Sequence, residues 1–292
     1  MAIRSLSALA DEANNRNVPL SVPVAEDEAS ETGVTVEEVR KRMGDMFIAM
    51  RDSVREGLAR EGKSVSGLTG GEAARYNARV EAGESLLGKP GAAAAACALA
   101  ASCVNASMGR IVAAPTAGSC GILPGVLIAL QQWKAFSDGA IVSALLTAAG
   151  VGQAISVRAT LSGAAGGCQA ECGSAAAMAA AAACELMGGN PDMCLDAAAL
   201  ALKNSLGLVC DPVAGLVEVP CVKRNAVFAV AALVAADMAL AGIRSVIPAD
   251  EVIDAMYSIG QAMPAALRET AKGGLAATPT GCRLKATIFS DK

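Results

Sequence analysis

Alanine-rich stretches separated by glycine and proline are the feature that most constrains the fold of this chain. From Gly91 to about Gly242, long apolar segments dominated by alanine alternate with short loops that contain glycine or proline. Alanine has the highest helix propensity, and its small side chain lets helices pack closely. Aromatic residues make up only 2% of the chain, so small aliphatic side chains must fill the core. We therefore expect an all-α fold, in which one large helical domain carries the functional site on its loops.

Hydrophobic periodicity and capping residues give the expected helix positions. Thr35 and Glu38 form a predicted capping box, and apolar residues follow at helical spacing as far as Leu58. A second polar helix is expected over 72–87, and a final one after Pro248. Little sheet is expected, because no long stretch alternates with period two. The other predicted helices cover 91–108, 122–136, 138–156, 173–188, 192–206 and 224–242.

The chain divides by composition into two expected parts. Residues 1–34 are polar and mixed, and we predict an N-terminal arm with one short helix there. Residues 35–292 form the predicted helical catalytic domain. The formal net charge is −4, which argues against a nucleic-acid partner.

Membrane insertion and secretion are also disfavoured by the residue pattern. The uncharged stretch 111–133 is long enough to span a bilayer, but two prolines and several glycines interrupt it. The apolar run 226–242 carries Asp237, and no aromatic belt flanks either stretch. Ten cysteines without a secretory signal indicate a reducing compartment, so we expect a cytoplasmic protein with free thiols.

Two short polar segments hold the most informative cysteines. Cys168 lies in Gly-Gly-Cys-Gln-Ala-Glu-Cys-Gly. Cys210 and Cys221 lie at the two ends of a segment rich in proline and valine. The chain contains no histidine, so it lacks the usual general base near neutral pH. The residues indicate a thiolate metal site, but the spacings match neither a zinc ribbon nor a ferredoxin run, which leaves the metal open.

Two further groups of residues accompany these thiols. The hydroxyl and amide groups of the loop Thr116, Gly118 and Ser119 could bind an anion such as a carboxylate, although a capping turn has the same composition. Lys223 and Arg224 follow Cys221 and could supply positive charge, although a solvated or partner-facing pair fits them equally.

Four segments resemble, in order, the alpha subunit of iron–sulfur-dependent L-serine dehydratase. The resemblance implies a [4Fe-4S] enzyme that converts L-serine to pyruvate and ammonia, with Cys168, Cys210 and Cys221 as the cluster ligands. Three ligands leave one iron open as a Lewis acid for the substrate hydroxyl. On the same resemblance, the Thr116–Ser119 loop is the candidate for the substrate carboxylate. The segments are 105–121, 166–174, 210–221 and 273–280.

The family resemblance also bears on the missing histidine. In the family a Ser-Ser-His-Thr type segment contributes to the site, and this chain has none, so a separate beta subunit is expected to supply it. Glu171 is the first candidate for a base within this chain, and orienting the loop around Cys168 is its other possible role. Cys282 follows a Gly-Gly run and is either a thiol that caps the open iron or a surface thiol.

Alternative functions stay open at this point. A related cluster enzyme could act on L-cysteine or L-threonine, because the sequence does not show the substrate pocket. A pyridoxal-phosphate dehydratase would need a Schiff-base lysine beside a phosphate cup, and Lys203 lies in a helical pattern without one. A membrane-embedded or purely structural protein is the remaining alternative.

Overall fold

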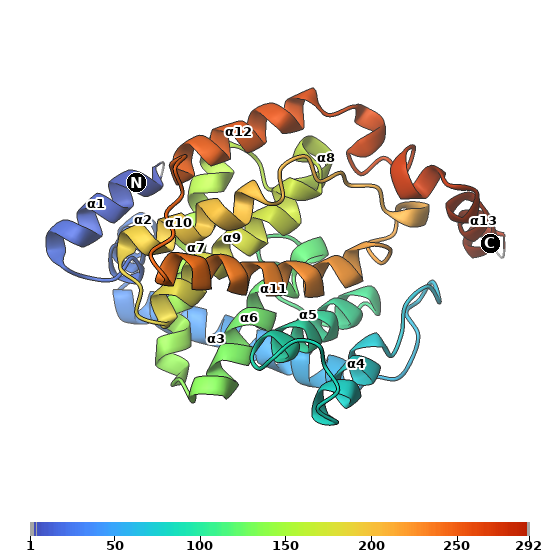
Figure 1. The fold of residues 1–292 in the computed structure, drawn as a ribbon, viewed down its shortest axis with the longest axis horizontal. Coiled ribbons are helices and arrows are strands. Elements are labelled where there is room, and N and C mark those ends of the chain that lie inside the picture. Colours follow the sequence, from blue (N-terminus) through green and yellow to red (C-terminus); the bar gives the residue numbers. More distant parts are fainter. Residues whose placement is uncertain (1–2, 4, 291–292) are drawn as a thin grey trace.

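The computed structural model describes residue 3 and residues 5–290, and this part of the chain is built from helices and turns, as the all-α prediction requires. Two isolated β-bridges, Lys63–Gly70 and Cys210–Arg268, are the other pairings among these residues. Figure 1 shows the helices as one body, with α13 and the C-terminus at one end. The α-helices are α1 (Leu6–Arg16), α2 (Ser21–Thr32), α3 (Val36–Ala59), α4 (Glu72–Glu81), α5 (Gly91–Ala106), α6 (Ile122–Lys134), α7 (Asp138–Arg158), α8 (Gly163–Gly166), α9 (Ser174–Leu186), α10 (Pro191–Lys203), α11 (Cys221–Leu240), α12 (Ala249–Ala262) and α13 (Pro279–Phe289).

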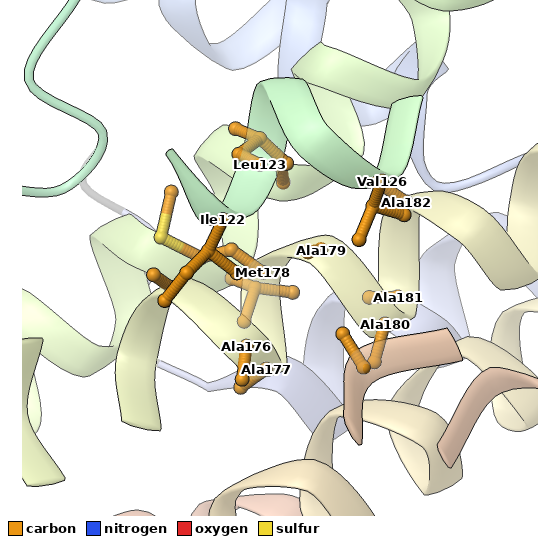
Figure 2. Close-up of a cluster of buried hydrophobic side chains, with 14 of the residues drawn as sticks. Ile122, Leu123, Val126, Ala176, Ala177, Met178, Ala179, Ala180, Ala181 and Ala182 are labelled. Carbon is orange, nitrogen blue, oxygen red and sulfur yellow. The ribbon is translucent and has the colours of Figure 1, made fainter. Parts of the chain in front are cut away.

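The helix α9 forms the centre of the core. Its alanines from 175 to 183 are at most 1% exposed, and α6, α7, α10 and α11 pack around them. In Figure 2, Ile122, Leu123 and Val126 of α6 lie above this row of alanines and Met178. Small side chains let the surrounding helices approach the α9 backbone closely, so the core is filled by helix backbone and methyl groups rather than by aromatic rings.

Glycines extend the same close packing to α5. A Cβ at Gly57 of α3 would lie only 2.1 Å from the carbonyl oxygen of Ala100, and one at Gly121 would lie 2.2 Å from the oxygen of Ala98. Both neighbours are backbone atoms of α5, which cannot move aside without shifting the helix. The contact of α5 with α3 and α6 therefore depends on the missing side chains.

The N-terminal segment differs from its prediction. Two helices, α1 and α2, form where one was expected, and Leu6 and Leu20 are each 1% exposed against the core. Asp250 in the first turn of α12 accepts hydrogen bonds from the N–H groups of Leu6 (2.9 Å) and Ser7 (3.2 Å). The first turn of α1 is thus capped by a residue far along the chain, which local sequence could not reveal.

The remaining predicted helices are confirmed with small shifts at their ends. The helix expected over 72–87 ends at Glu81, and Thr35 caps α3 by accepting a hydrogen bond from the N–H of Glu38 (3.2 Å). The helices α8 and α13 were not predicted. The helix α7 is long and apolar enough to cross a membrane, but 67% of its apolar window is buried inside the structure, as in the core helix of a globular protein.

Candidate active site

Three buried cysteines come together from three separate segments. Cys168 directly precedes the π-helical turn η2 (Gln169–Gly173), Cys210 lies in the connection after α10, and Cys221 is the first residue of α11. Their exposed fractions are 2%, 3% and 7%. Burial raises the pKa of Cys221 to about 12, and the negative charge of a nearby Cys168 thiolate adds to this effect. Burial likewise raises the pKa of Cys210, together with the charges of Glu171 and Cys168.

Gln169 fixes the position of η2 against two other segments. Its backbone N–H donates to the carbonyl of Leu208 (3.1 Å), and its side-chain oxygen accepts from the N–H of Gly207 (2.9 Å). Its amide nitrogen donates to the carbonyls of Gly166 and Met256, at 2.9 Å each. The side chain is completely buried. The polar atoms of the Gln169 side chain thus all have hydrogen-bond partners. These bonds hold Cys168 beside the segment 207–208, which leads to Cys210.

Cys172 lies beside Cys168 on the same turn. The two Sγ atoms are 3.4 Å apart, as the spacing of four residues predicted for a shared face. This thiol–thiol hydrogen bond, with the positive charge of Arg224, holds the pKa of Cys168 below its usual value despite burial. Cys172 therefore lies with the three predicted cysteines, although sequence reasoning assigned no ligand role to it.

A hydroxyl–carboxylate pair adjoins the thiols. Thr116 Oγ1 donates to Glu171 Oε1 (2.9 Å) and is 3.1 Å from Ser119 Oγ, while Cys210 Sγ donates to Glu171 Oε2 (3.7 Å). A Cβ at Gly118 would lie 3.2 Å from Glu171 Oε1, so glycine permits the close approach. Burial raises the pKa of Glu171. The predicted residues of the Thr116 loop and Glu171 thus lie together with Cys210.

Asn225 holds the Thr116 loop against α11, and sequence reasoning missed it. Its side-chain nitrogen donates to the carbonyl of Gly118 (2.8 Å), and its side-chain oxygen accepts from the N–H of Gly121 (2.8 Å). Asn105 at the end of α5 donates to the carbonyl of Ala117 (3.0 Å). Asn225 is 1% exposed. The signal available in the sequence was its place four residues after Cys221, one helical turn along the predicted helix.

Arg224 and Lys223 point in different directions. The Arg224 guanidinium donates to the carbonyl of Val209 (2.9 Å) and to Asp211 Oδ1 (3.2 Å), beside the thiols. Lys223 instead forms an ion pair with Glu72 of α4 (2.8 Å). The side chain of Arg224 is 16% exposed and that of Lys223 is 49% exposed. Arg224 is thus the cation that adjoins the site, and Lys223 links α11 to α4.

Glu269 is a second carboxylate that the sequence reasoning did not single out. Its carboxylate oxygen, a carboxylate oxygen of Glu171 and the Cys210 thiol all lie within 4.8 Å of one another. The backbone joins the same groups, because the N–H of Glu269 donates to the carbonyl of Cys210 (2.7 Å) and the N–H of Cys210 donates to that of Leu267 (2.9 Å). Its place shortly before the Gly-Gly-Leu segment was the available signal.

Cys282 has contacts separate from those of Cys168, Cys210 and Cys221. It is exposed on α13, and its thiol donates weakly to the carbonyl of Ala276 (3.9 Å). No hydrogen bond among residues 3 and 5–290 links it to the three buried cysteines. Its capping role stays an untested expectation.

The donor set of the site suits an iron–sulfur cluster. Cys168, Cys210 and Cys221 are all unpaired thiols on turns and a helix start, and soft thiolates are the usual ligands of such clusters. Gly167 shows that the site depends on close backbone approach, since its φ is +75° and a Cβ there would lie 2.9 Å from the carbonyl oxygen of Leu208. The three cysteines and the close backbone packing around them therefore fit an iron–sulfur cluster.

The fold and the site thus define a helical protein with a group of buried thiols on its loops. Comparison with known proteins shows the family. Residues 15–276 match the family described as serine dehydratase alpha chain. The chain is 50% identical to the probable L-serine dehydratase, alpha chain, of Bacillus subtilis over 98% of this chain and 95% of that one. It is 44% identical to the L-serine dehydratase, alpha chain, of Peptoniphilus asaccharolyticus over 96% of each. The chain belongs to the serine dehydratase alpha chain family.

One longer relative places this unit within a larger protein. The L-serine dehydratase of Streptomyces coelicolor is 38% identical over 84% of this chain, but the match covers only 55% of that protein. Nearly half of the longer relative thus lies outside the unit that this chain represents.

Proposed function

We propose that this chain is the catalytic alpha subunit of an L-serine dehydratase, a lyase that converts L-serine to pyruvate and ammonia. The observation that carries the proposal is the meeting of three buried thiols, from Cys168, Cys210 and Cys221, with the carboxylate of Glu171 in a chain of this family. Free thiols throughout the described chain are in keeping with a cytoplasmic enzyme.

Cys168, Cys210 and Cys221 are the residues that would hold a [4Fe-4S] cluster. When bound, such a cluster with three protein ligands supplies an open iron, a Lewis acid that can take up the β-hydroxyl of serine. Arg224 offers the nearby positive charge that stabilises thiolates in a buried setting, since the Cys172 hydrogen bond and then the charge of Arg224 lower the pKa of Cys168.

The polar residues around the thiols have separate proposed roles. Thr116 and Ser119, on a loop that Asn225 fixes to α11, orient the substrate carboxylate through their hydroxyl and amide groups. Glu171 is the candidate within this chain for moving the α-proton, because burial raises its pKa above the ordinary value and so makes the carboxylate a stronger base. Removal of the α-proton together with loss of the β-hydroxyl as water would give aminoacrylate. Its imine tautomer would then be hydrolysed to pyruvate and ammonia.

A separate beta subunit is the proposed partner. Relatives of similar length are named alpha chains, and in the Streptomyces coelicolor protein the matched unit is only 55% of the chain. The absence of histidine from all 292 residues supports a second chain that contributes the missing base or substrate contacts.

The test is iron and sulfide analysis after anaerobic purification, on the wild-type chain and on Cys→Ser variants at 168, 210 and 221. Each variant is expected to lose most of the iron and sulfide, because serine is a poor ligand for this group. The matched control is Cys184→Ser, which changes a completely buried cysteine at the far end of α9.

The outcomes separate the parts of the proposal. Absence of iron and sulfide from the wild-type protein would overturn the cluster assignment. Full cluster content in one variant would remove that residue from the ligand set. Faster turnover of L-threonine or L-cysteine than of L-serine, measured with the partner present, would show that L-serine is not the preferred substrate.

A further inference from the structure

A buried carboxylate beside the site is held by three hydroxyl groups. Glu218 lies between Cys210 and Cys221 and is 5% exposed. Its Oε2 accepts from Ser64 Oγ (2.5 Å) and Thr69 Oγ1 (2.7 Å), and its Oε1 accepts from Ser66 Oγ (2.7 Å). All three donors come from one loop, residues 62–71, more than a hundred positions earlier in the chain. A carboxylate so deeply buried is stable only with such partners.

The loop 62–71 is shaped to present these hydroxyls. The N–H of Ser64 donates to the carbonyl of Thr69 (2.8 Å), and Lys63 pairs with Gly70 across the base of the loop. At Gly70 the φ is +156°, and a Cβ would lie 2.5 Å from the Cα of Lys63, so the closure requires glycine. Ser64 and Thr69 are buried, whereas Val65 at the tip is 82% exposed. The loop therefore turns its hydroxyl face toward Glu218.

The backbone of Glu218 is tied to both neighbouring parts of the site. Its carbonyl accepts the N–H of Val222 (3.0 Å) in the first turn of α11, directly after Cys221. The adjacent Val217 would be 3.5 Å from a Cβ at Gly118, in the loop that carries Thr116. The residue that carries the buried carboxylate is thus bonded to the first turn of α11, and its neighbour Val217 faces the Thr116 loop.

We infer that Glu218 is a positioning residue that ties loop 62–71 to the segment between Cys210 and Cys221 and thereby sets where these two thiols lie. The inference rests on the proposed function for its meaning, because the position of the thiols matters through the cluster they would hold. The Lys223–Glu72 ion pair (2.8 Å) runs in parallel, since it joins α11 to the helix that follows the loop. The buried carboxylate is the stronger tie, as exposed ion pairs contribute little.

The test compares Glu218→Gln with the wild-type chain by hydrogen exchange and by iron analysis. Glutamine has nearly the same shape but loses the charge that the hydroxyls stabilise, and it can accept at only one oxygen. Amide exchange is expected to rise about tenfold or more in residues 62–71 and in residues 213–222. Iron per chain after anaerobic reconstitution is expected to fall below about half of the wild-type value, with an altered visible spectrum.

Two controls make the result specific. Glu84→Gln changes an exposed carboxylate that pairs with Arg79 and should leave both readouts unchanged. The double variant Ser64→Ala with Ser66→Ala removes donors from the other side, and its effect should be much smaller in the Glu218→Gln background than in the wild-type chain.

Faster exchange confined to residues 62–71, with wild-type iron content, would overturn the inference, because Glu218 would then only anchor the loop. Unchanged exchange in both segments would overturn it as well. A wild-type chain without iron would defeat the proposed function, while exchange in residues 213–222 would still decide whether Glu218 positions this segment.

Discussion

Single polar residues within the alanine core account for the geometry of the site. Gln169 and Asn225 are at most 1% exposed, and each joins segments that are distant in sequence. Leaving such a buried group unpaired costs about 1–3 kcal/mol, so each arrangement strongly favours one set of loop positions. Glu171 differs, because burial raises its pKa and its partners are a hydroxyl and a thiol of the site itself.

Glu171→Gln is expected to lower kcat for L-serine by about 100-fold or more while iron content stays at the wild-type level. The amide keeps the size of the side chain but cannot take up a proton, and Thr116 loses a charged partner. Steady-state kinetics with the partner subunit present, alongside iron analysis, is the measurement.

Glu185→Gln is the matched control, since Glu185 is also a carboxyl whose pKa is raised by burial and which accepts from a hydroxyl, that of Thr147. Glu185 lies at the end of α9, away from Cys168, Cys210 and Cys221. Its variant should keep the wild-type kcat. A wild-type kcat in Glu171→Gln would leave Glu171 with the orienting role alone and transfer the base to the partner.

At the scale of the elements, the close packing of helices depends on glycine as much as on alanine. Gly57 of α3 faces the backbone of α5, where a Cβ would lie 2.1 Å from the carbonyl oxygen of Ala100. Gly44 lies on the same helix, and its Cβ would meet nothing closer than 3.9 Å. Helix propensity favours alanine over glycine by about 1 kcal/mol at both positions, so tertiary packing alone distinguishes them.

Gly57→Ala is therefore expected to lower the free energy of unfolding by about 1–3 kcal/mol, because overpacking against backbone outweighs the gain in propensity. Gly44→Ala should leave the free energy of unfolding unchanged or raise it by up to about 1 kcal/mol. Urea denaturation of both variants measures the difference. Equal stabilisation by the two substitutions would show that α3 and α5 are not in close contact at Gly57.

At the scale of the whole molecule, the chain supplies a thiol site without the side chain that most enzymes use as a base. Its 292 residues include no histidine, and the family match extends over residues 15–276. Segments from distant parts of the chain meet at the thiols, so the site depends on how the helices pack. These segments are the Thr116 loop, η2, the connection with Cys210, the start of α11 and the segment with Glu269. The proposed beta subunit would complete the site.

The chain purified alone, with its iron intact, is expected to turn over L-serine at less than about 1% of the rate reached after adding the beta subunit, because loss of the substrate contacts that the second chain is proposed to supply would misplace serine, and misplacement costs about 100-fold. Pyruvate formation across a titration of the second chain is the measurement, and activity should saturate at a fixed ratio of the two. Full activity of the chain by itself would show that no second chain completes the site.

Much of the fold follows from local sequence. Long alanine-rich runs between glycine and proline specify α5, α6, α7, α9, α10 and α11, because propensity and loop chemistry agree there. The weakly apolar helices α1 and α2 do not follow in the same way, since remote contacts such as that of Asp250 stabilise them. Lys223 and Arg224 are adjacent in the sequence and had the same predicted role. The tertiary structure gives their side chains different partners, Glu72 for Lys223 and Asp211 for Arg224.

By itself, then, the sequence determined the helical class, the family resemblance and the cysteines on which the site depends, because propensity and motif spacing are local properties. Only the tertiary structure decided which groups meet. Asn225, Glu269 and Glu218 join the site or its support through contacts with residues that lie from tens to more than a hundred positions away in the chain. The physical reason is that buried polar groups must find partners, and in a folded chain those partners come from wherever the packing of the helices brings the loops together.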